Sequence, residues 1–160
     1  MSDVLQSEPD DVDRAVLGIL QRDARATNRD IARRLGLAES TAHARARRLE
    51  SRGVIAGYEA VVRQSRLGRG LQALIHVTLR PGARQTSLTE FRELVSALPE
   101  VNQLFFLGGT DDFIVHVAVE DSSALRRLVV DHLSANPAVA STRTSIVFEY
   151  HRNITTASFD

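Results

Sequence analysis

The chain of 160 residues carries no net charge at neutral pH, and its 43% hydrophobic and 25% charged residues are ordinary for a globular protein. No apolar run approaches about 18 residues, which excludes a membrane-spanning helix, and the absence of cysteine excludes disulfides and thiolate metal sites. The acidic start MSDVLQSEPDD lacks the basic and apolar stretches of a signal peptide, so we expect a cytoplasmic protein with no membrane partner.

Charge is distributed unevenly along the chain. Residues 28–69 contain ten arginines and four acidic residues, whereas residues 70–160 contain seven arginines and ten acidic residues. A basic block attracts polyanions such as nucleic acid, and an acidic block repels them. The asymmetry therefore predicts one part of the chain that meets a polyanion and another part that does not.

Three helices are predicted in the first third of the chain. Thr27 and Asp30 form a capping-box pattern at the start of the second helix, and Asp10 or Asp11 is placed to cap the first. Glycine adopts the left-handed conformation that a helix end needs, so Gly36 ends the second helix. The predicted helices cover about 12–22, 28–35 and 39–52, and the segment 54–62 after them is predicted to be a short strand.

The second half of the chain changes to the alternating period of strands. In LQALIHVTL, apolar side chains recur at every second position, and Pro81 and Gly82 then end the strand. The resulting order β-α-β-β-α-β is the ferredoxin-like arrangement of four antiparallel strands with two helices on one face, which makes the chain an α+β protein. Strands are predicted at 71–79, 101–107, 113–119 and 139–148, and helices at about 88–98 and 125–133.

The predicted sheet carries apolar residues on both faces, although two helices cover only one of them. Leu74 opposes Ile75, and Ile114 opposes Val115. An open apolar face is usually an interaction site, and burying about 800 Å² on each partner at about 25 cal/mol per Å² gives a large gross driving force. We therefore expect a homodimer that forms through the sheets.

The third predicted helix has one apolar stripe and an opposite polar face. Ala42, Ala46 and Leu49 fall at i, i+4 and i+7, which is the spacing of a buried stripe. A helix with arginines on its outer side fits the major groove of DNA, where the guanidinium fork takes the O6 and N7 atoms of guanine. The predicted contacts to double-stranded DNA are Ser40, Thr41, His43, Ala44, Arg45, Arg47 and Arg48.

Two alternatives to base recognition stay open for this helix. Its charged face is also compatible with plain solvation, and Arg45 or Arg48 could pair with Glu39 or Glu50 or touch phosphate instead of a base. The glycine turn, the small residues at the helix crossing and the strand predicted after the helix favour DNA binding.

The run NRDIARRLGLAESTAHARARRLESRGVIAGYEAVV (28–62), followed by LGGTDDF (107–113), resembles the Lrp/AsnC family of leucine-responsive, or feast/famine, regulators. The resemblance implies a winged helix-turn-helix DNA-binding domain over 10–62, a linker over 63–70 and an effector-sensing domain (RAM) over 71–150. It also implies dimers that assemble into tetramers or octamers, and an amino acid or related metabolite as the small-molecule effector.

The resemblance places the effector in a pocket lined by the loop between the second and third strands. Gly109, Asp112 and Phe113 match the family's pattern there, and the last strand carries a matching Thr-x-Thr. Exposed backbone N–H groups suit a carboxylate, and an aspartate suits an ammonium group. A plain hairpin turn with solvated acids is the alternative. The effector-binding residues implied are Gly108, Gly109, Thr110, Asp111, Asp112, Thr142 and Thr144.

The chain departs from the usual family sequence at the start of the third predicted helix. Relatives often have Ser-Pro where this chain has Ala38-Glu39, so a helix cap worth about 1 kcal/mol is lost unless a neighbour replaces it. An architectural DNA-binding protein with little metabolite control is the alternative function. An enzyme is not expected, since His76 and His116 have no nearby carboxylate in the sequence. No catalytic residue, metal or cofactor is predicted.

Overall fold

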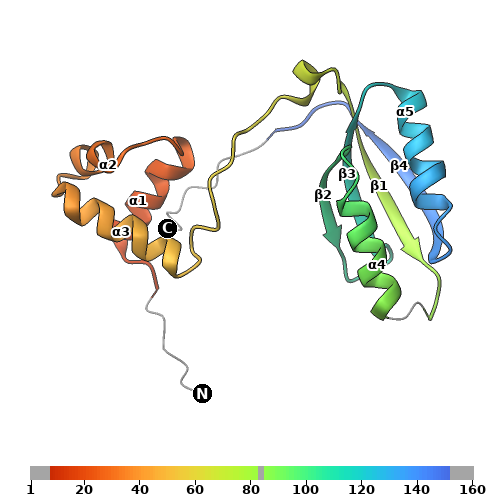
Figure 1. Ribbon diagram of the computed structural model, residues 1–160, viewed down its shortest axis with the longest axis horizontal. Helices are drawn as coiled ribbons and strands as arrows, with labels where there is room; N and C mark the ends of the chain where they lie inside the picture. The colour runs from red at the N-terminus through yellow and green to blue at the C-terminus, as the bar shows by residue number, and fades with distance from the viewer. Residues whose placement is uncertain (1–7, 83–84, 152–160) are drawn as a thin grey trace. The chain divides into compact units, whose positions relative to one another are not determined.

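The computed structural model describes residues 8–82 and 85–151, and for residues 85 and 86 it describes the backbone alone. The chain divides into two compact units, and the boundary lies between Val61 and Val62 (Figure 1). None of the helices in these described ranges is long and apolar enough to cross a membrane.

The first unit is a bundle of three helices whose starts follow the predicted capping. Asp10 caps α1 (Asp11–Arg22), and Thr27 caps α2 (Asn28–Leu35), each within a complete capping box. Gly36 ends α2 in the left-handed conformation, with a φ of 66°. The third helix, α3 (Glu39–Ser51), begins after Ala38, which makes no side-chain capping bond. The three predicted helices are confirmed.

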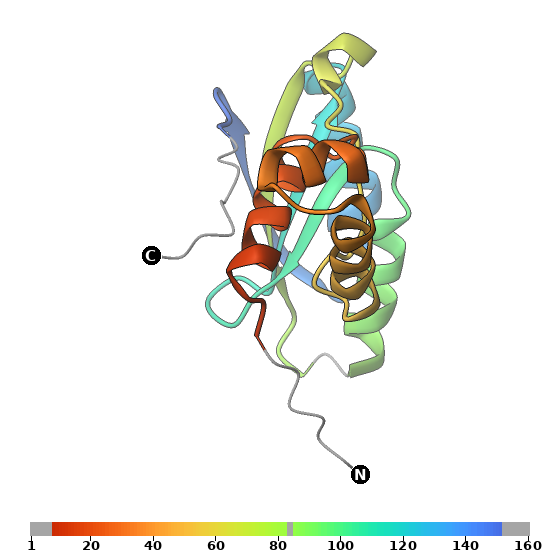
Figure 2. The ribbon, with the colours of Figure 1, turned by 90° about the vertical axis from the view of Figure 1, so that its left-hand side faces the viewer.

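The core of this unit is formed where the three helices meet. Val16 of α1, Ile31 of α2, and Ala42 and Leu49 of α3 are fully or almost fully buried against one another. Because the side chain of Ala42 is short, α3 can pack closely against the other helices at this position. Figure 2 shows these three helices from a second direction.

The strand predicted over 54–62 is wrong for this chain. The segment runs in an irregular course: Ile55 packs on the core of the first unit, and the Tyr58 hydroxyl donates a hydrogen bond of 2.9 Å to Glu50. A strand needs a neighbouring edge to accept its backbone hydrogen bonds, and the described residues form no ladder with this segment. Val61, 78% exposed, lies at its end.

The second unit is a four-stranded antiparallel sheet with the order β2-β3-β1-β4. This order confirms the ferredoxin-like arrangement, and Figures 1 and 2 show both long helices on one face of the sheet. A 3₁₀ turn, η1, precedes it. The elements are η1 (Gln64–Leu67), β1 (Leu71–Leu79), α4 (Gln85–Ser96), β2 (Val101–Phe106), β3 (Phe113–Val119), α5 (Ser122–Arg127), η2 (Leu128–Ser134) and β4 (Val139–Val147).

The second long helix differs from the prediction in one respect. Asp121 caps α5 four residues before Leu125, where the predicted helix began, and the helix continues as a π-helix, η2. A π-helix turns less per residue than an α-helix, and Leu128 and Leu133 remain buried through the change. The apolar spacing alone could not distinguish the two forms.

The two faces of the sheet differ as the alternation predicts. Ile75 and Val77 of β1 and Val115 of β3 are fully buried beneath the helices. On the other face, Leu74 and Ile114 are only partly buried, and we call this side the open face. The open face is therefore a mixed apolar and polar surface that the helices do not cover.

Candidate functional site

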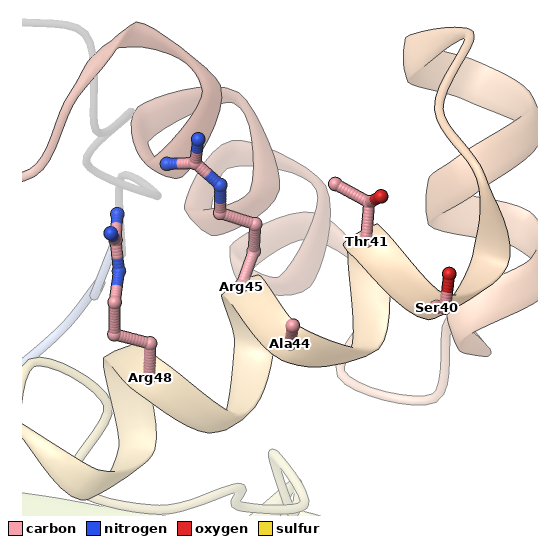
Figure 3. A pocket seen from close by; sticks show the side chains of 5 residues that line it. All are labelled: Ser40, Thr41, Ala44, Arg45 and Arg48. Carbon is pink, nitrogen blue, oxygen red and sulfur yellow. The ribbon is translucent and has the colours of Figure 1, made fainter.

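The outward side of α3 is the first candidate site. Ala42, Ala46 and Leu49 are buried, as their spacing predicts. Ser40 and His43 are exposed on the other side of the helix, which we call the outer face of α3. A shallow pocket of about 340 Å³ lies beside it and is lined by Ser40, Thr41, Ala44, Arg45 and Arg48 (Figure 3). The predicted DNA-contacting residues that are exposed are Ser40, Thr41, His43, Ala44, Arg47 and Arg48, whereas Arg45 is half-buried.

Arg45 and Arg48 reach from α3 toward the start of α1 instead of pointing straight outward (Figure 3). Arg45 binds Asp10 and lies 3.1 Å from Oδ1 of Asp13, and Arg48 binds Oδ2 of Asp13. The alternative pairing with Glu39 or Glu50 is therefore wrong. We call Asp10, Asp13, Arg45 and Arg48 the α1–α3 charge cluster.

Asp13 is the one buried charged side chain among the described residues, with an exposed fraction of 0%. Its carboxylate is satisfied by two guanidinium groups and by the backbone N–H of Asp10 at 3.3 Å. The hydrogen bond from Arg45 is the main cause that lowers the pKa of Asp10 and raises that of Arg45. Asp10 and Arg45 therefore stay ionised at neutral pH, and the contacts of the cluster tie α3 to α1.

Arg47 stands apart from this cluster. It is exposed and has no ion-pair partner among the residues that the structure describes. One turn earlier, His43 accepts a hydrogen bond at Nδ1 from the side-chain amide of Asn28 at 3.0 Å. Because Nδ1 accepts, Nε2 of neutral His43 carries the proton and is a donor. The outer face of α3 thus presents one free guanidinium and one oriented imidazole.

The second candidate site is the β2–β3 loop, residues 107–112. Asp112 fixes this loop to the end of β1: its Oδ2 accepts from the backbone N–H of Leu79 at 2.6 Å, and its own N–H donates to Val77 at 2.9 Å. Gly108 and Gly109 are exposed at the tip. Asp112 therefore holds the loop in place, while the glycines present accessible backbone.

Asp111 lies on the open face of the sheet and contacts two basic side chains. Its Oδ2 lies 2.9 Å from Nδ1 of His76 and 3.0 Å from the Arg143 guanidinium. The sequence reading that left His76 without a nearby carboxylate is therefore wrong, because the loop folds back over β1. His116, in contrast, donates from Nε2 to the side-chain oxygen of Gln72 at 3.0 Å, and burial lowers its pKa.

The chain does not bring the two implied threonines to this carboxylate. Thr144 pairs across the sheet with Ile75, and Thr142 pairs with Val77, so both lie on the face that the helices cover. Directly opposed residues of antiparallel strands share one face, which places Arg143 with His76 on the open face instead. Thr142 and Asp111 therefore lie on opposite faces of the sheet.

Sequence reasoning missed several residues that shape these sites, because their partners are distant in the chain. Asp13 meets arginines 32 and 35 residues away, and Arg143 meets a carboxylate 32 residues away. The one available signal for Asp13 was an acidic residue at a position facing a helical core. No group of three or more His, Asp or Glu among the described residues could hold a metal ion.

Comparisons with known proteins match both units. A family model described as Lrp/AsnC ligand binding domain matches residues 72–154, and one described as winged helix-turn-helix DNA-binding matches residues 9–56. The HTH-type transcriptional regulator AldR of Mycolicibacterium smegmatis is 43% identical over 150 residues, which cover 94% of this chain and 87% of that protein.

Two further relatives are also transcriptional regulators. The leucine-responsive regulatory protein of Escherichia coli K12 is 34% identical over 140 residues, which cover 88% of this chain and 85% of that protein. The solved complex of a Neisseria meningitidis transcriptional regulator with L-Met superposes with a TM-score of 0.84 and 28% identity, covering 92% and 94% of the two chains. These relatives are transcriptional regulators, not enzymes. The chain belongs to the Lrp/AsnC family of DNA-binding transcriptional regulators with a ligand-binding domain.

Proposed function

We propose that an amino acid or a related small metabolite binds at the β2–β3 loop and thereby modulates DNA binding or assembly. The observation that carries this proposal is that, among the described residues, only one of the two carboxylate oxygens of Asp111 makes contacts. Both of its contacts, to His76 and Arg143, use Oδ2, and Oδ1 has no hydrogen-bond partner in the described part of the chain. The carboxylate therefore keeps one oxygen available for an ammonium group.

The chemistry around Asp111 suits both ends of an amino acid. Arg143, 67% exposed, carries a guanidinium fork that can take a carboxylate through two parallel hydrogen bonds. An exposed ion pair contributes only about 0–1 kcal/mol, so a ligand can take Arg143 from Asp111 at small cost. Exposed backbone at Gly108 and Gly109 adds donors nearby. The relative solved with L-Met supports an amino acid as the ligand.

The surface that contacts double-stranded DNA is, in this proposal, the outer face of α3. Ser40 and Thr41 stand in the first turn, where hydroxyl and backbone donors meet phosphate. His43 and Arg47 stand about one and two turns further along and can reach base edges in the major groove. A regulator that binds chromosomal DNA in this way acts in the cytoplasm.

We further propose that two copies associate through the open face and that such dimers assemble into tetramers or octamers. Leu74 and Ile114 form the apolar part of this face, and Phe105 of β2, 46% exposed, extends it. Apolar surface of this kind is stabilised by burial at about 25 cal/mol per Å². The position of Asp111 on the same face links the ligand site to assembly.

A thermal-shift series with the twenty amino acids tests the ligand assignment, because a ligand that binds only the folded state raises the unfolding temperature. We expect at least one amino acid to raise it for the parental protein, with no shift for Asp111→Asn. Asp131→Asn removes the same charge from an exposed position on η2 and is expected to respond like the parent.

Two results would contradict the proposal. No shift with any amino acid would favour an architectural DNA-binding protein, and an equal shift in Asp111→Asn and the parent would place the ligand elsewhere. Sedimentation velocity with and without the active amino acid reports assembly, and a parental protein that sediments only as a single chain would exclude association through the open face.

A further inference from the structure

We propose that Asp13 is a positioning residue for DNA recognition: together with Asp10 it holds Arg45 and Arg48 against α1, which leaves Arg47 as the guanidinium that reads bases. This inference rests on the proposed assignment of the outer face of α3 as the DNA-contacting surface. It divides the three arginines of α3 into two fixed residues and one free residue.

The carboxylates of the α1–α3 charge cluster cannot turn away from the arginines. The backbone N–H of Asp13 donates to Oδ1 of Asp10 at 2.8 Å, and the backbone N–H of Asp10 donates to Oδ2 of Asp13 at 3.3 Å. This reciprocal capping box fixes both side chains on the first turn of α1. Arg45 contacts both carboxylates. Arg48 binds Asp13 and also lies 3.6 Å from Asp10.

Burial decides whether a phosphate can compete for these arginines. Asp13 is 0% exposed, whereas Arg45 and Arg48 are 27% and 44% exposed. An arginine that left Asp13 for a DNA phosphate would leave a buried carboxylate without its partner, which is strongly unfavourable. The two guanidinium groups are therefore retained by α1 when DNA approaches.

The consequence is a lower net charge on the DNA-facing surface than the sequence suggests. Two carboxylates compensate two of the arginines on α3, and among the described residues Arg47 has no such partner. Phosphate contacts by arginine raise affinity for every DNA sequence, whereas base contacts favour one sequence over others. Withholding Arg45 and Arg48 from phosphates thus favours specific over non-specific binding.

The experiment measures how the affinity of the full chain depends on salt, for an operator selected from random DNA and for a scrambled duplex. Each arginine that gains a phosphate contact steepens the slope of log K against log salt by about 0.9. For Asp13→Asn we expect a steeper slope on both duplexes, tighter binding to scrambled DNA and a smaller ratio of specific to non-specific affinity.

A matched control separates this role from the general loss of one negative charge. Asp11→Asn removes the same charge from the neighbouring position on α1, where the carboxylate contacts Arg14 instead of α3. Asp10→Asn keeps a good helix cap and releases part of the hold on Arg45, so it gives the same readout if Asp13→Asn does not fold. We expect its slope to lie between those of the parent and Asp13→Asn.

The outcomes distinguish the positioning role of Asp13 from the assignment of the DNA-contacting surface. If the cluster variants have the same slope and specificity ratio as Asp11→Asn while the parent binds its operator specifically, the positioning role is overturned and the DNA-contacting surface stands. If both affinities fall together without a steeper slope, Asp13 is only a structural residue, which also overturns it. A parental protein without sequence-specific binding would overturn the surface assignment and this inference with it.

Discussion

Asp13 and Asp111 each contact two basic side chains, but the two carboxylates differ in exposure. Asp13 is 0% exposed, and removing a partner from a buried ion pair costs about 3–5 kcal/mol. Asp111 is 17% exposed and one of its partners is a well-exposed arginine, so exchanging that partner costs at most about 1 kcal/mol. The same carboxylate chemistry therefore suits a fixed helix contact in one place and an exchangeable ligand contact in the other.

Asp10 gives a prediction on pH and stability. The hydrogen bond from Arg45, followed by one from the backbone N–H of Asp13, lowers its pKa below the ordinary value of 3.8. A carboxyl group with a lower pKa in the folded state stabilises the fold fully above its unfolded pKa, and this stability is lost as the pH falls through the folded pKa. We expect the unfolding temperature to fall below about pH 3.8, and Asp10→Asn to reduce this fall.

Circular dichroism melts measure how far the unfolding temperature falls with pH in the parent, Asp10→Asn and Asp11→Asn. The series runs from about pH 6 to about pH 2.5, which spans the ordinary pKa of an aspartate. Asp11 is 98% exposed and serves as the matched carboxylate. Parallel curves for the parent and Asp10→Asn would show that the contact with Arg45 contributes nothing to acid stability.

At the level of elements, local patterns predicted what depends on neighbours in sequence. Thr27 and Asp30 cap α2 because they are three residues apart, and β1 alternates because its two faces meet different surroundings. The strand expected over 54–62 failed because a ladder needs a second edge, which no pattern within the segment supplies. The π-helix η2 preserves the burial of its apolar residues, so the sequence could not reveal it.

In the candidate sites too, local spacing predicted some features, whereas others depend on how distant elements pack. The buried stripe and outer face of α3 follow from helical spacing, and the structure confirms which of these residues are buried. The partners of Arg45 and Asp111 depend on how separate elements pack, so they could not be read from spacing. The placement of Thr142 on the helix-covered face follows from the register of β4 against β1, which also needs the folded sheet.

The start of α3 gives a prediction for a single element. Ala38 has the extended backbone of a helix cap, with φ −68° and ψ 146°, but no side chain that can bond the free N–H groups of the first turn. Ala38→Ser supplies that acceptor and is expected to stabilise the protein by about 0.5–2 kcal/mol in urea denaturation.

The control for this prediction is the same substitution inside the helix. Ala44→Ser places a hydroxyl on an exposed interior position, where serine is less favourable than alanine by up to about 0.7 kcal/mol. Equal stability of Ala38→Ser and the parent would indicate that the first turn of α3 already satisfies its N–H groups with water.

At the scale of the whole molecule, the two units differ in charge and surface as their tasks differ. The first unit carries α3 with its arginines, and the second carries an open sheet face with Asp111 beside Arg143. If the open face mediates association, as we propose, ligand binding there would change how many DNA-binding units act together. This coupling requires no change inside the helix bundle, because the number of linked sites itself sets the avidity for DNA.

The most direct measurement of the central claim is a fluorescence-anisotropy titration of the selected operator with the parent, Arg47→Ala and Arg126→Ala. Arg126 is an exposed arginine on α5 and controls for the loss of one positive charge. We expect Arg47→Ala to weaken operator binding by about 1–3 kcal/mol while binding to scrambled DNA changes far less. Arg126→Ala should match the parent. Operator affinity of Arg47→Ala equal to that of the parent would contradict the assignment of the outer face of α3 as the DNA-reading surface.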